Sequence, residues 1–308
     1  MKKKDVNILR IIIAVLIILY LIFGTDLIKD MSKNTALASK ISNSDKTTTK
    51  KVISDGELNV YFIDVGQADS ILITNKDHNI LIDAGNNEDG KKLVDYFKSL
   101  NITSFDYVFG THPHEDHIGG MDDIINNFDI DKYYMPDKLS TSKTFEDVLD
   151  ALINKNLKYT VPKEDEVISF NDASIDVIYV DSNSKDANDS SIVLKLTYGE
   201  NSFLFTDDAS TSVENKILNK NIKSDVLKIG HHGSEYSTSD KFLDMVNPKY
   251  AIIEVGTDNI YKHPKQIILD RLNIRNIKTY RTDLDGTIIV TTNGTSVSIK
   301  TEKTDTNG

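Results

Sequence analysis

The 308-residue chain contains no cysteine and no tryptophan. Without cysteine it cannot build a disulfide framework, a thiolate-ligated zinc or iron–sulfur site, or a lipoprotein anchor. It also lacks the dinucleotide-binding pattern G-x-G-x-x-G and the complete phosphate-loop pattern G-x-x-x-x-G-K-[S/T], so we expect no nucleotide cofactor. A transition-metal site in this chain must therefore use histidine and carboxylate ligands, which directs attention to its seven histidines.

Basic residues are the minority among the charged ones. The chain has 36 lysines and arginines against 47 aspartates and glutamates, a net charge of −11. The balance is uneven, because residues 1–56 carry +5 and the remainder carries −16. This argues against a chain-wide basic surface for nucleic acid, whose binding is dominated by phosphates. If DNA is the substrate, we expect a local basic groove built from a minority of the lysines.

Residues 1–30 have the pattern of a membrane signal anchor. Lys2–Lys4 form a positive segment, and Arg10 precedes an unbroken apolar run of thirteen residues, Ile11–Phe23. That length suits the apolar region of a signal peptide, about 7–15 residues, better than a full span of about 20. The A-x-A cleavage pattern at Ala36–Ala38 lies well beyond the run, so we favour an uncleaved anchor over a cleaved, secreted form. The positive-inside rule then places the rest of the chain on the extracellular face of the cell membrane.

Residues 31–56 have the polar composition of a flexible linker, and a folded domain is expected over residues 57–308. Strand patterns come early and late with helices interspersed, which indicates two mixed sheets with helices outside rather than a doubly wound parallel sheet. The expected strands are Leu58–Asp64, Ser70–Ile73, Asn79–Asp83, Phe105–Thr111, Ser174–Val180, Ser191–Tyr198, Ser202–Thr206, Val226–Ile229, Tyr250–Val255, Gly286–Thr291 and Ser296–Thr301, and the expected helices are Gly90–Leu100, Thr211–Leu218, Ser239–Met245 and Pro264–Leu272.

Residues 112–117 read H-P-H-E-D-H and follow a predicted buried strand. Four of the six, His112, His114, Asp116 and His117, are metal-ligand types that suit zinc, manganese or iron. In an extended chain His112 and His114 can bind one ion. Asp116 and His117 can bind a second ion once the chain turns into a helix. The alternative, a solvated polar loop, is disfavoured because three of the seven histidines fall within six residues.

Further polar residues follow other predicted strands. Asp83 ends a strand and is expected either to orient ligand imidazoles or to serve as a turn residue. Asp207 and Asp208 follow another strand, and a carboxylate there is placed to bridge two metals. One imidazole of the pair His231 and His232 can complete a second site, and His263, before a predicted helix, is either a proton donor facing substrate or a helix-capping loop residue.

These motifs together resemble the metallo-β-lactamase fold superfamily, and within it the extracellular hydrolase domain of ComEC-type competence proteins. The multi-span channel of competence proteins is absent from this sequence, so we expect a standalone, membrane-tethered relative. The segments that carry the resemblance are Phe62–Ile73, Thr111–Met121, Asn188–Leu194, Phe203–Ala209, Leu227–Ser234, Tyr261–Pro264 and Asp283–Thr287.

The resemblance implies an α+β fold, a four-layer αββα sandwich with metals at one edge. Its metal ligands, carried over by position, would be His112 and His114 for metal one, Asp116, His117 and His231 for metal two, and Asp208 as the bridge. Asp116 would also steer the attacking water, and His263 would protonate the leaving group or bind the anion. His232 and Asp83 would lie around these ligands.

The sequence departs from the family pattern in three places. Ala68 replaces a glycine of the family's D-V-G-Q-G-D segment. Asp207 stands where the family has glycine before the bridging aspartate. No histidine lies between His117 and His231, where most superfamily hydrolases supply a third ligand to metal one. Asn188 or Asp189 would fill that position weakly through oxygen. We therefore expect one or two divalent ions, zinc or manganese, with metal one the looser.

The resemblance implies a metal-dependent hydrolase that cleaves phosphodiester bonds. The most specific version of this expectation is a nuclease that acts on DNA. A hydrolase of a small ester, lactone or β-lactam is the alternative, since an acidic surface does not oppose a neutral substrate. A catalytically silent surface binding module is the second alternative, because of the missing histidine. The sequence does not indicate an oligomeric state.

Overall fold

The computed structural model describes residues 56–303. The expected anchor, residues 1–30, and the linker up to residue 55 lie outside the described part of the chain. Between residues 56 and 303, no helix combines the length and the hydropathy that crossing a membrane requires.

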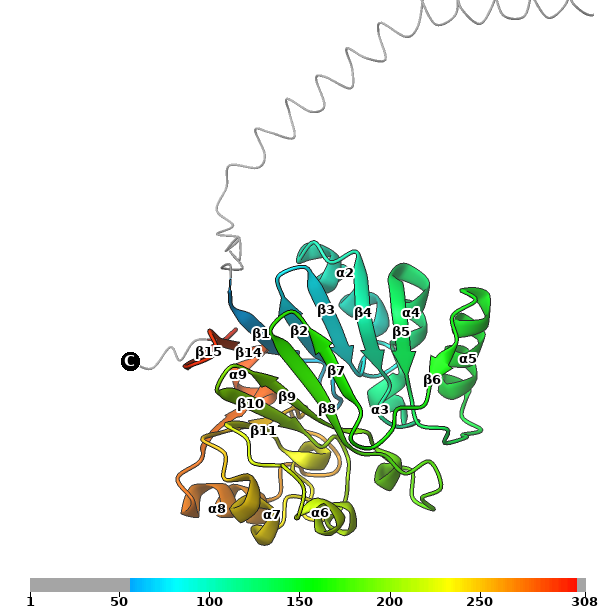
Figure 1. Cartoon of the computed structure of the whole chain (residues 1–308). Helices are drawn as coiled ribbons and strands as arrows, with labels where there is room; N and C mark the ends of the chain where they lie inside the picture. The colour runs from blue at the N-terminus through cyan, green and yellow to red at the C-terminus, as the bar shows by residue number, and fades with distance from the viewer. Residues whose placement is uncertain (1–55, 304–308) are drawn as a thin grey trace, which may run out of the picture. The chain divides into compact units, whose positions relative to one another are not determined.

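An eight-stranded mixed sheet forms the first half of the fold (Figure 1). Helices α2 (Gly90–Ser99), α4 (Met121–Asn127) and α5 (Lys143–Asn154) cover its outer face, and their apolar residues pack with it in one buried cluster. The strand order is β15 (Val297–Thr301), β14 (Ile288–Thr292), β1 (Leu58–Phe62), β2 (Ile71–Asn75), β3 (His78–Ile82), β4 (Ser104–Phe109), β5 (Asp129–Tyr134) and β6 (Tyr159–Thr160).

A seven-stranded mixed sheet forms the second half. Helices α6 (Thr211–Ile217), α7 (Asp240–Val246) and α8 (Gln266–Ile274) pack on its outer face in a separate buried cluster. The strand order is β13 (Lys278–Arg281), β12 (Tyr250–Ile253), β11 (Val226–Lys228), β10 (Asn201–Phe205), β9 (Val193–Tyr198), β8 (Ala173–Tyr179) and β7 (Val167–Phe170), and the short α9 (Thr282–Asp285) follows β13.

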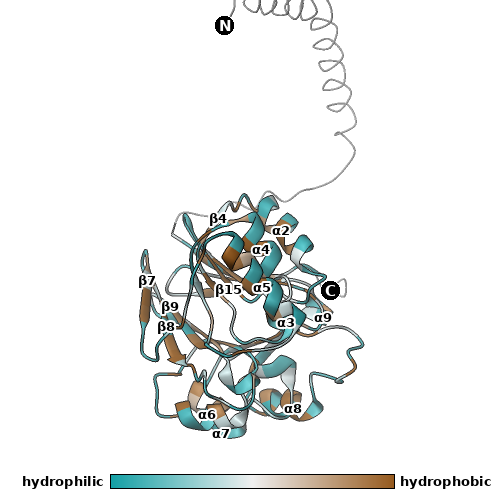
Figure 2. Ribbon diagram, turned by 90° about the vertical axis from the view of Figure 1, so that its right-hand side faces the viewer, coloured by the Kyte–Doolittle hydropathy of each residue, from teal (hydrophilic) through white to brown (hydrophobic). Residues whose placement is uncertain are grey.

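The main core lies between the two sheets, and strand alternation produces it. On β1, Leu58, Val60 and Phe62 pack in the cluster between the sheets, whereas Tyr61 packs with the helices outside. Phe62 meets Phe205 of β10 across this layer, with ring centroids 6.2 Å apart. Helices outside carry both teal and brown residues, as amphipathic helices do (Figure 2). The expected four-layer αββα arrangement is confirmed.

Parallel strands bring the polar segments of both sheets to one edge. Strands β3 and β4 are parallel, as are β10, β11 and β12, so the residues that follow each strand emerge on the same side within a sheet. The short helices α3 (Glu115–Ile118), η1 (Asn188–Ser190) and η2 (Gly230–Gly233) lie in these strand-end loops. This edge holds the histidine motifs.

Candidate metal centre

Residues His112, His114 and Asp208 form the first ligand cluster. One donor atom from each lies within 4.8 Å of the others. His112 Nε2 is 3.1 Å from His114 Nδ1 and 3.9 Å from Asp208 Oδ2. His114 is extended (φ −82°, ψ 151°) and α3 begins directly after it, as the spacing of the motif predicts. Burial and the nearby His117 lower the pKa of His112 well below its usual value, so its ring is neutral, the form that binds metals.

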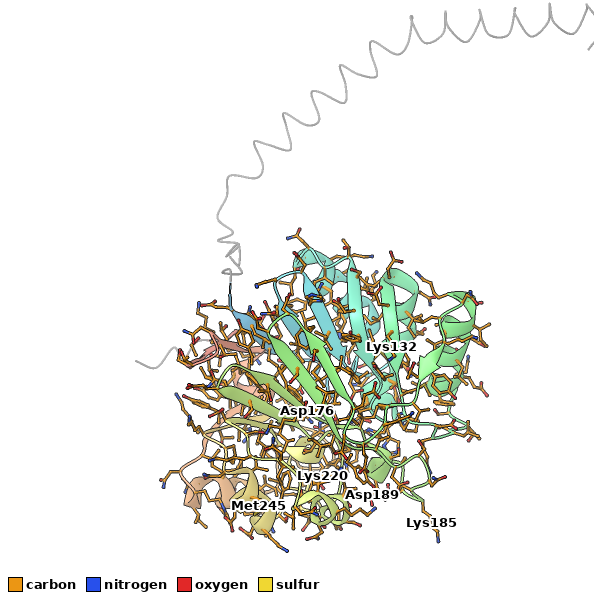
Figure 3. All side chains as sticks on the ribbon, viewed as in Figure 1. Lys132, Asp176, Lys185, Asp189, Lys220 and Met245 are labelled. Atoms are coloured by element: carbon orange, nitrogen blue, oxygen red, sulfur yellow. The ribbon has the colours of Figure 1, made fainter. Side chains whose placement is uncertain are left out.

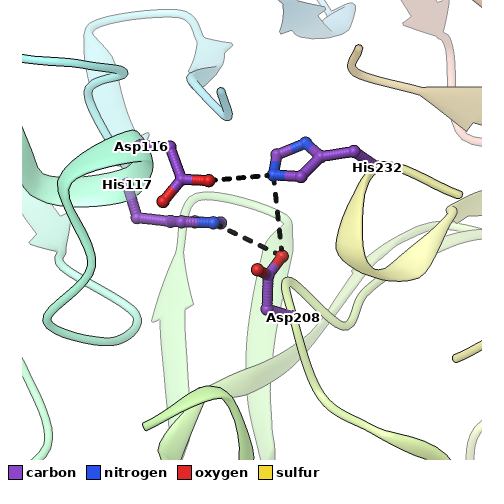
Figure 4. Close-up of side chains that lie close together, drawn as sticks. All are labelled: Asp116, His117, Asp208 and His232. Atoms are coloured by element: carbon purple, nitrogen blue, oxygen red, sulfur yellow. Dashed lines mark ion pairs between the residues drawn. The ribbon is translucent and has the colours of Figure 1, made fainter. Parts of the chain in front are cut away.

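A second cluster shares Asp208 and adds Asp116, His117 and His232 (Figure 4). His117 Nε2 lies 3.3 Å from Asp208 Oδ1, and His232 Nε2 lies 3.4 Å from Asp116 Oδ2 and 3.9 Å from Asp208 Oδ1. Residues from three separate loops therefore converge here, and Asp208 lies between the two clusters, the position expected of a bridging ligand.

The two histidines of the adjacent pair lie in different places. His232 is the one that joins Asp116, His117 and Asp208 in the second cluster, where the family resemblance predicts His231. His231 instead places its Nε2 atom 3.4 Å from Asp208 Oδ2. Both residues have left-handed backbones, with φ of 51° and 54°, so the chain turns sharply at this pair. An extended-chain reading of H-H-G-S does not show which ring faces the cluster.

A hydrogen-bonded carboxylate fixes the ring of His117. Its Nδ1 atom lies 2.7 Å from Asp83 Oδ2, and Asp83 in turn accepts hydrogen bonds from the backbone N–H of Thr111 (2.9 Å) and from its hydroxyl (2.6 Å). Asp83 is fully buried and has a left-handed backbone (φ 57°). Its position supports the predicted orienting role over the turn-residue alternative, because Nε2 of His117 is left to face the cluster.

A buried ion pair lies beneath His232, and the sequence patterns did not predict it. His232 Nδ1 lies 2.9 Å from the carbonyl oxygen of Glu254 and 3.3 Å from Asp69 Oδ1. Asp69 also forms an ion pair with Lys228, and both side chains are completely buried. The available signal was a lysine inside the apolar strand Val226–Ile229, since a buried lysine requires a carboxylate partner.

Several buried polar atoms at the clusters have no hydrogen-bond partner, which is the test of whether the residues suit a metal. These atoms are His117 Nε2, His232 Nε2 and Asp208 Oδ1. Unpartnered polar atoms in a protein interior are costly, so a group that satisfies them is expected. Imidazole nitrogens and carboxylate oxygens converging from both clusters are the donors that zinc and manganese accept. The residues therefore fit a divalent metal.

Excess negative charge surrounds the second cluster. Burial alone would lower the pKa of His117, but Asp208 and Asp83 outweigh it and raise that pKa well above its usual value. Burial acts in the same way on His232, yet Asp69 and Asp208 raise its pKa to about 10. The carboxylates thus hold protons on both rings, and a divalent cation would take the place of those protons because metal ligands must be deprotonated.

The loop before β9 contains the predicted substitutes for the missing histidine. Asn188 lines the cavity described below, and its Oδ1 atom is buried without a hydrogen-bond partner. Asp189 instead accepts a hydrogen bond from the backbone N–H of Ser210 (3.2 Å). Ser191 Oγ lies 3.4 Å from His112 Nδ1, on the ring edge away from the cluster. Of the two candidates, Asn188 is the one that lines the cavity and has a buried oxygen without a hydrogen-bond partner.

Asp207 occupies the position where the family has glycine. Its backbone is left-handed (φ 45°), a conformation glycine adopts without strain. Its side chain is fully buried, and neither carboxylate oxygen has a hydrogen-bond partner. Burial and the nearby Asp83 raise the pKa of Asp207 well above its usual value. The substitution therefore places an unsatisfied carboxyl group behind the ligands.

A cavity of about 720 Å³ opens over the two clusters. His263 lines it and stacks edge-on against His231, with ring centroids 5.8 Å apart. Burial and the nearby His231 lower the pKa of His263 to about 4, so its ring is neutral at neutral pH. A Cβ atom at Gly233 would lie 2.5 Å from that of Pro264, which shows why the close approach of this loop to η2 requires glycine.

The cavity lining contains no lysine or arginine among the described residues. Two lysines labelled in Figure 3, Lys132 and Lys220, lie near carboxylates elsewhere on the fold. Lys220 lies 2.7 Å from Glu164, and Lys132 lies 3.9 Å from Glu166. Among the described residues that line this cavity, the local basic groove expected for a DNA substrate is therefore not found.

A family model, the metallo-β-lactamase superfamily, matches residues 63–256. The chain belongs to the metallo-β-lactamase superfamily. ComE operon protein 3 of Bacillus subtilis (strain 168) is 31% identical over 256 residues, which cover 76% of this chain and 33% of that protein. Competence protein ComA of Neisseria gonorrhoeae is 41% identical over 106 residues, 33% of this chain and 15% of that protein. The predicted resemblance to competence proteins is confirmed, although this chain matches only about a third of the longer relative.

Among solved structures, the metallo-β-lactamase fold protein YhfI from Bacillus subtilis superposes with a TM-score of 0.52. It shares 12% sequence identity, and the match covers 73% of this chain and 95% of that protein. This similarity is one of fold. Superfamily membership and the converging ligands together support a metal-dependent hydrolase that holds a divalent ion.

Proposed function

We propose that this metallo-β-lactamase-fold chain hydrolyses phosphodiester bonds with water at the His112–His232 edge. The observation that carries the proposal is the pair of ligand clusters sharing Asp208, because two adjacent cations suit the attacking and leaving oxygens of a phosphodiester. Two similar proteins support the same substrate class by their names, competence protein ComA of Neisseria gonorrhoeae and recombination protein 2 of Haemophilus influenzae.

We assign one ion to His112, His114 and Asp208, with Asn188 as a weak oxygen ligand, and the other to Asp116, His117, His232 and Asp208. His231 and Asp189 lie outside both sets. When bound, zinc or manganese would activate water and neutralise charge on the phosphodiester. The exchange of His231 for His232 is the only change from the ligand set that the family resemblance implies.

The chain's own residues supply the rest of the chemistry. Asp116, whose pKa is held below its usual value against burial by His117 and His232, is ionised and can accept a hydrogen bond from the attacking water. His263 is neutral, so it binds the substrate oxygen as an N–H donor rather than as a cation. This favours the anion-binding alternative for His263 over the proton-donor alternative.

We also propose that the domain works on the extracellular face of the cell membrane, held there by residues 1–30. The apolar run Ile11–Phe23, with Lys2–Lys4 before it, supports this placement. Labelling of intact cells with a membrane-impermeant amine reagent tests it, since lysines of the folded domain react only if the domain is outside.

A panel of reporter substrates tests the reaction class. The full chain, supplied with zinc or manganese, is assayed with bis-p-nitrophenyl phosphate, p-nitrophenyl acetate, a lactone and a β-lactam. We expect turnover of the phosphodiester to exceed that of the others. A brisk esterase, lactonase or lactamase without phosphodiester cleavage would instead establish the small-substrate alternative, which the absence of cations in the cavity lining favours.

A further inference from the structure

One loop builds an aromatic wall of the cavity. Residues 254–263 run from the end of β12 to His263. Ile260 and Tyr261 are exposed in this loop, with 86% and 55% of their surfaces accessible. Both line the cavity. Large apolar side chains at the mouth of a polar cavity indicate contact with an uncharged part of a ligand.

The base of this loop is held in place by Asn259. Its side-chain amide donates to the carbonyl oxygens of Gly256 (2.9 Å) and His263 (2.7 Å) and accepts from the backbone N–H of His263 (2.9 Å). Lys265 donates to the carbonyl oxygen of Tyr261 (2.8 Å). These bonds fix the backbone on both sides of Tyr261, so its ring is presented in a defined place.

Three rings connect the cavity mouth to the metal ligands. Tyr261 stacks on His263 with centroids 5.6 Å apart and an interplanar angle of 25°, and His263 meets His231 at 5.8 Å. His231 Nε2 in turn lies 3.4 Å from Asp208. Asp208 and Tyr261 line the same cavity. A planar group that stacked on Tyr261 would therefore lie at the cavity mouth, while a phosphoryl group of the same molecule is held over Asp208.

The negative charge around the cavity mouth limits how many further phosphate groups a substrate can carry. Glu88, Glu115 and Asp258 line the cavity and are exposed, and no lysine or arginine joins them there. The loop's own Lys262 is exposed but is not part of the lining. Cations at the ligand clusters would neutralise one phosphoryl group, whereas further phosphates on either side would meet this carboxylate rim.

We propose that the substrate is a short phosphodiester, with one anionic group at the metals and a planar ring elsewhere on the same molecule that stacks on Tyr261. This inference rests on the proposed phosphodiesterase function and narrows its substrate class. A long single strand of nucleic acid is a poor substrate, because its neighbouring phosphates face Glu88, Glu115 and Asp258.

Two single-phosphodiester substrates test the stacking. Thymidylyl-thymidine carries planar rings and glycerophosphoglycerol carries none. In the full chain with added metal, Tyr261→Ala should lower kcat/KM for thymidylyl-thymidine roughly 5- to 100-fold, the loss expected when one aromatic stack on a base is removed. Tyr261→Phe should keep the native value. Tyr261→Ala should lower kcat/KM for glycerophosphoglycerol far less than for thymidylyl-thymidine, because only the stack on a base is specific to the second substrate.

Tyr236 provides the matched control, because it is 72% exposed and does not line the cavity. Tyr236→Ala should leave both substrates unaffected. As a second readout, saturation-transfer NMR should detect thymine ring protons against the native chain and lose that signal with Tyr261→Ala. Equal turnover and equal NMR signal in Tyr261→Ala would overturn the stacking role.

Substrates of different length test whether the carboxylates of Glu88, Glu115 and Asp258 disfavour a long strand. Per linkage, the native chain should cleave thymidylyl-thymidine at least about tenfold better than a 20-nucleotide oligothymidylate. The combined variant Glu88→Gln, Glu115→Gln, Asp258→Asn should narrow that gap by improving the long substrate alone. A native chain that prefers the long strand would overturn the inference while leaving the phosphodiesterase proposal intact, and a chain that cleaves no phosphodiester would overturn both.

Discussion

His232 Nε2 lies 3.4 Å from Asp116 Oδ2, although the two residues come from opposite sheets of the sandwich. The neighbouring His231 approaches Asp208 Oδ2 instead, also at 3.4 Å. Both histidines have left-handed backbones and line the cavity, but their surroundings differ. His232 is buried with its Nδ1 atom fixed, and the side chain of His231 is partly exposed.

The first prediction separates these two histidines. His232→Ala should remove about one metal equivalent per chain after dialysis, because a ligand is lost from a cluster whose other members cannot replace it. His231→Ala should retain the native metal content. Elemental analysis of both variants decides the matter, and equal depletion in the two would return His231 to the ligand set.

The second prediction concerns the carboxylate behind His117. Asp83→Asn should weaken metal binding about 10- to 100-fold, the usual effect of removing a hydrogen-bonded partner from a ligand imidazole. Asp106→Asn is the matched control, since Asp106 also lies 2.7 Å from a histidine Nδ1, that of His78, outside the clusters. Competition with a chelator measures the affinities. Equal effects from both variants would show only a general loss of stability.

The third prediction is that Asp207→Gly stabilises the metal-free chain. The change removes a buried carboxyl group without hydrogen-bond partners and relieves a left-handed backbone at a residue other than glycine. Together these are worth about 1–3 kcal/mol in the free energy of unfolding. Urea denaturation in the presence of chelator measures it. Asp207→Asn keeps a polar side chain there, so it should increase the free energy of unfolding by less than Asp207→Gly. A glycine variant less stable than the native chain would contradict the prediction.

The fourth prediction concerns pH and Glu214, which lies on α6 away from the ligands. Its carboxylate accepts the backbone N–H groups of Thr238 and Ser239 at the start of α7, yet burial raises its pKa above the usual value. A raised pKa in the folded state means that its stabilising contribution is present below about pH 4.5 and declines as pH rises through the folded-state pKa.

Glu214→Gln isolates this effect, because all other groups titrate alike in both chains. The stability of the native chain relative to the glutamine variant should therefore fall as pH rises from about 4 to 7. Parallel urea denaturation of the two metal-free chains at several pH values measures the difference. A relative stability that increased with pH would mean that the backbone hydrogen bonds outweigh burial.

Much of the fold follows from local sequence patterns. The strand Leu58–Phe62 alternates between the two cores as its apolar residues predict, and α2 buries Leu93, Val94 and Phe97 on one face. The strands β5, β6, β7 and β13 were not predicted. Strand β13, K-T-Y-R, has no apolar alternation, so only its pairing with β12 reveals it.

The candidate site was predictable where ligands are close in sequence. Residues 112–117 cluster because a short extended segment leads directly into α3. The choice between His231 and His232 was not predictable, because it depends on two left-handed residues and on Glu254 from another strand. The ion pair between Asp69 and Lys228 was not predictable for a related reason. The two residues are far apart in the sequence and meet only when β11 lies against the loop before β2.

We propose above all that the clusters sharing Asp208 hold divalent metal and that the chain needs this metal to cleave phosphodiesters. The most direct measurement is turnover of bis-p-nitrophenyl phosphate by chelator-treated chain as zinc or manganese is restored, with metal content followed in parallel. The account predicts no turnover without metal, recovery in the native chain as its metal content rises, and neither recovery nor full metal content in Asp208→Ala. Metal that binds fully without producing turnover, or turnover that survives in Asp208→Ala, would contradict it.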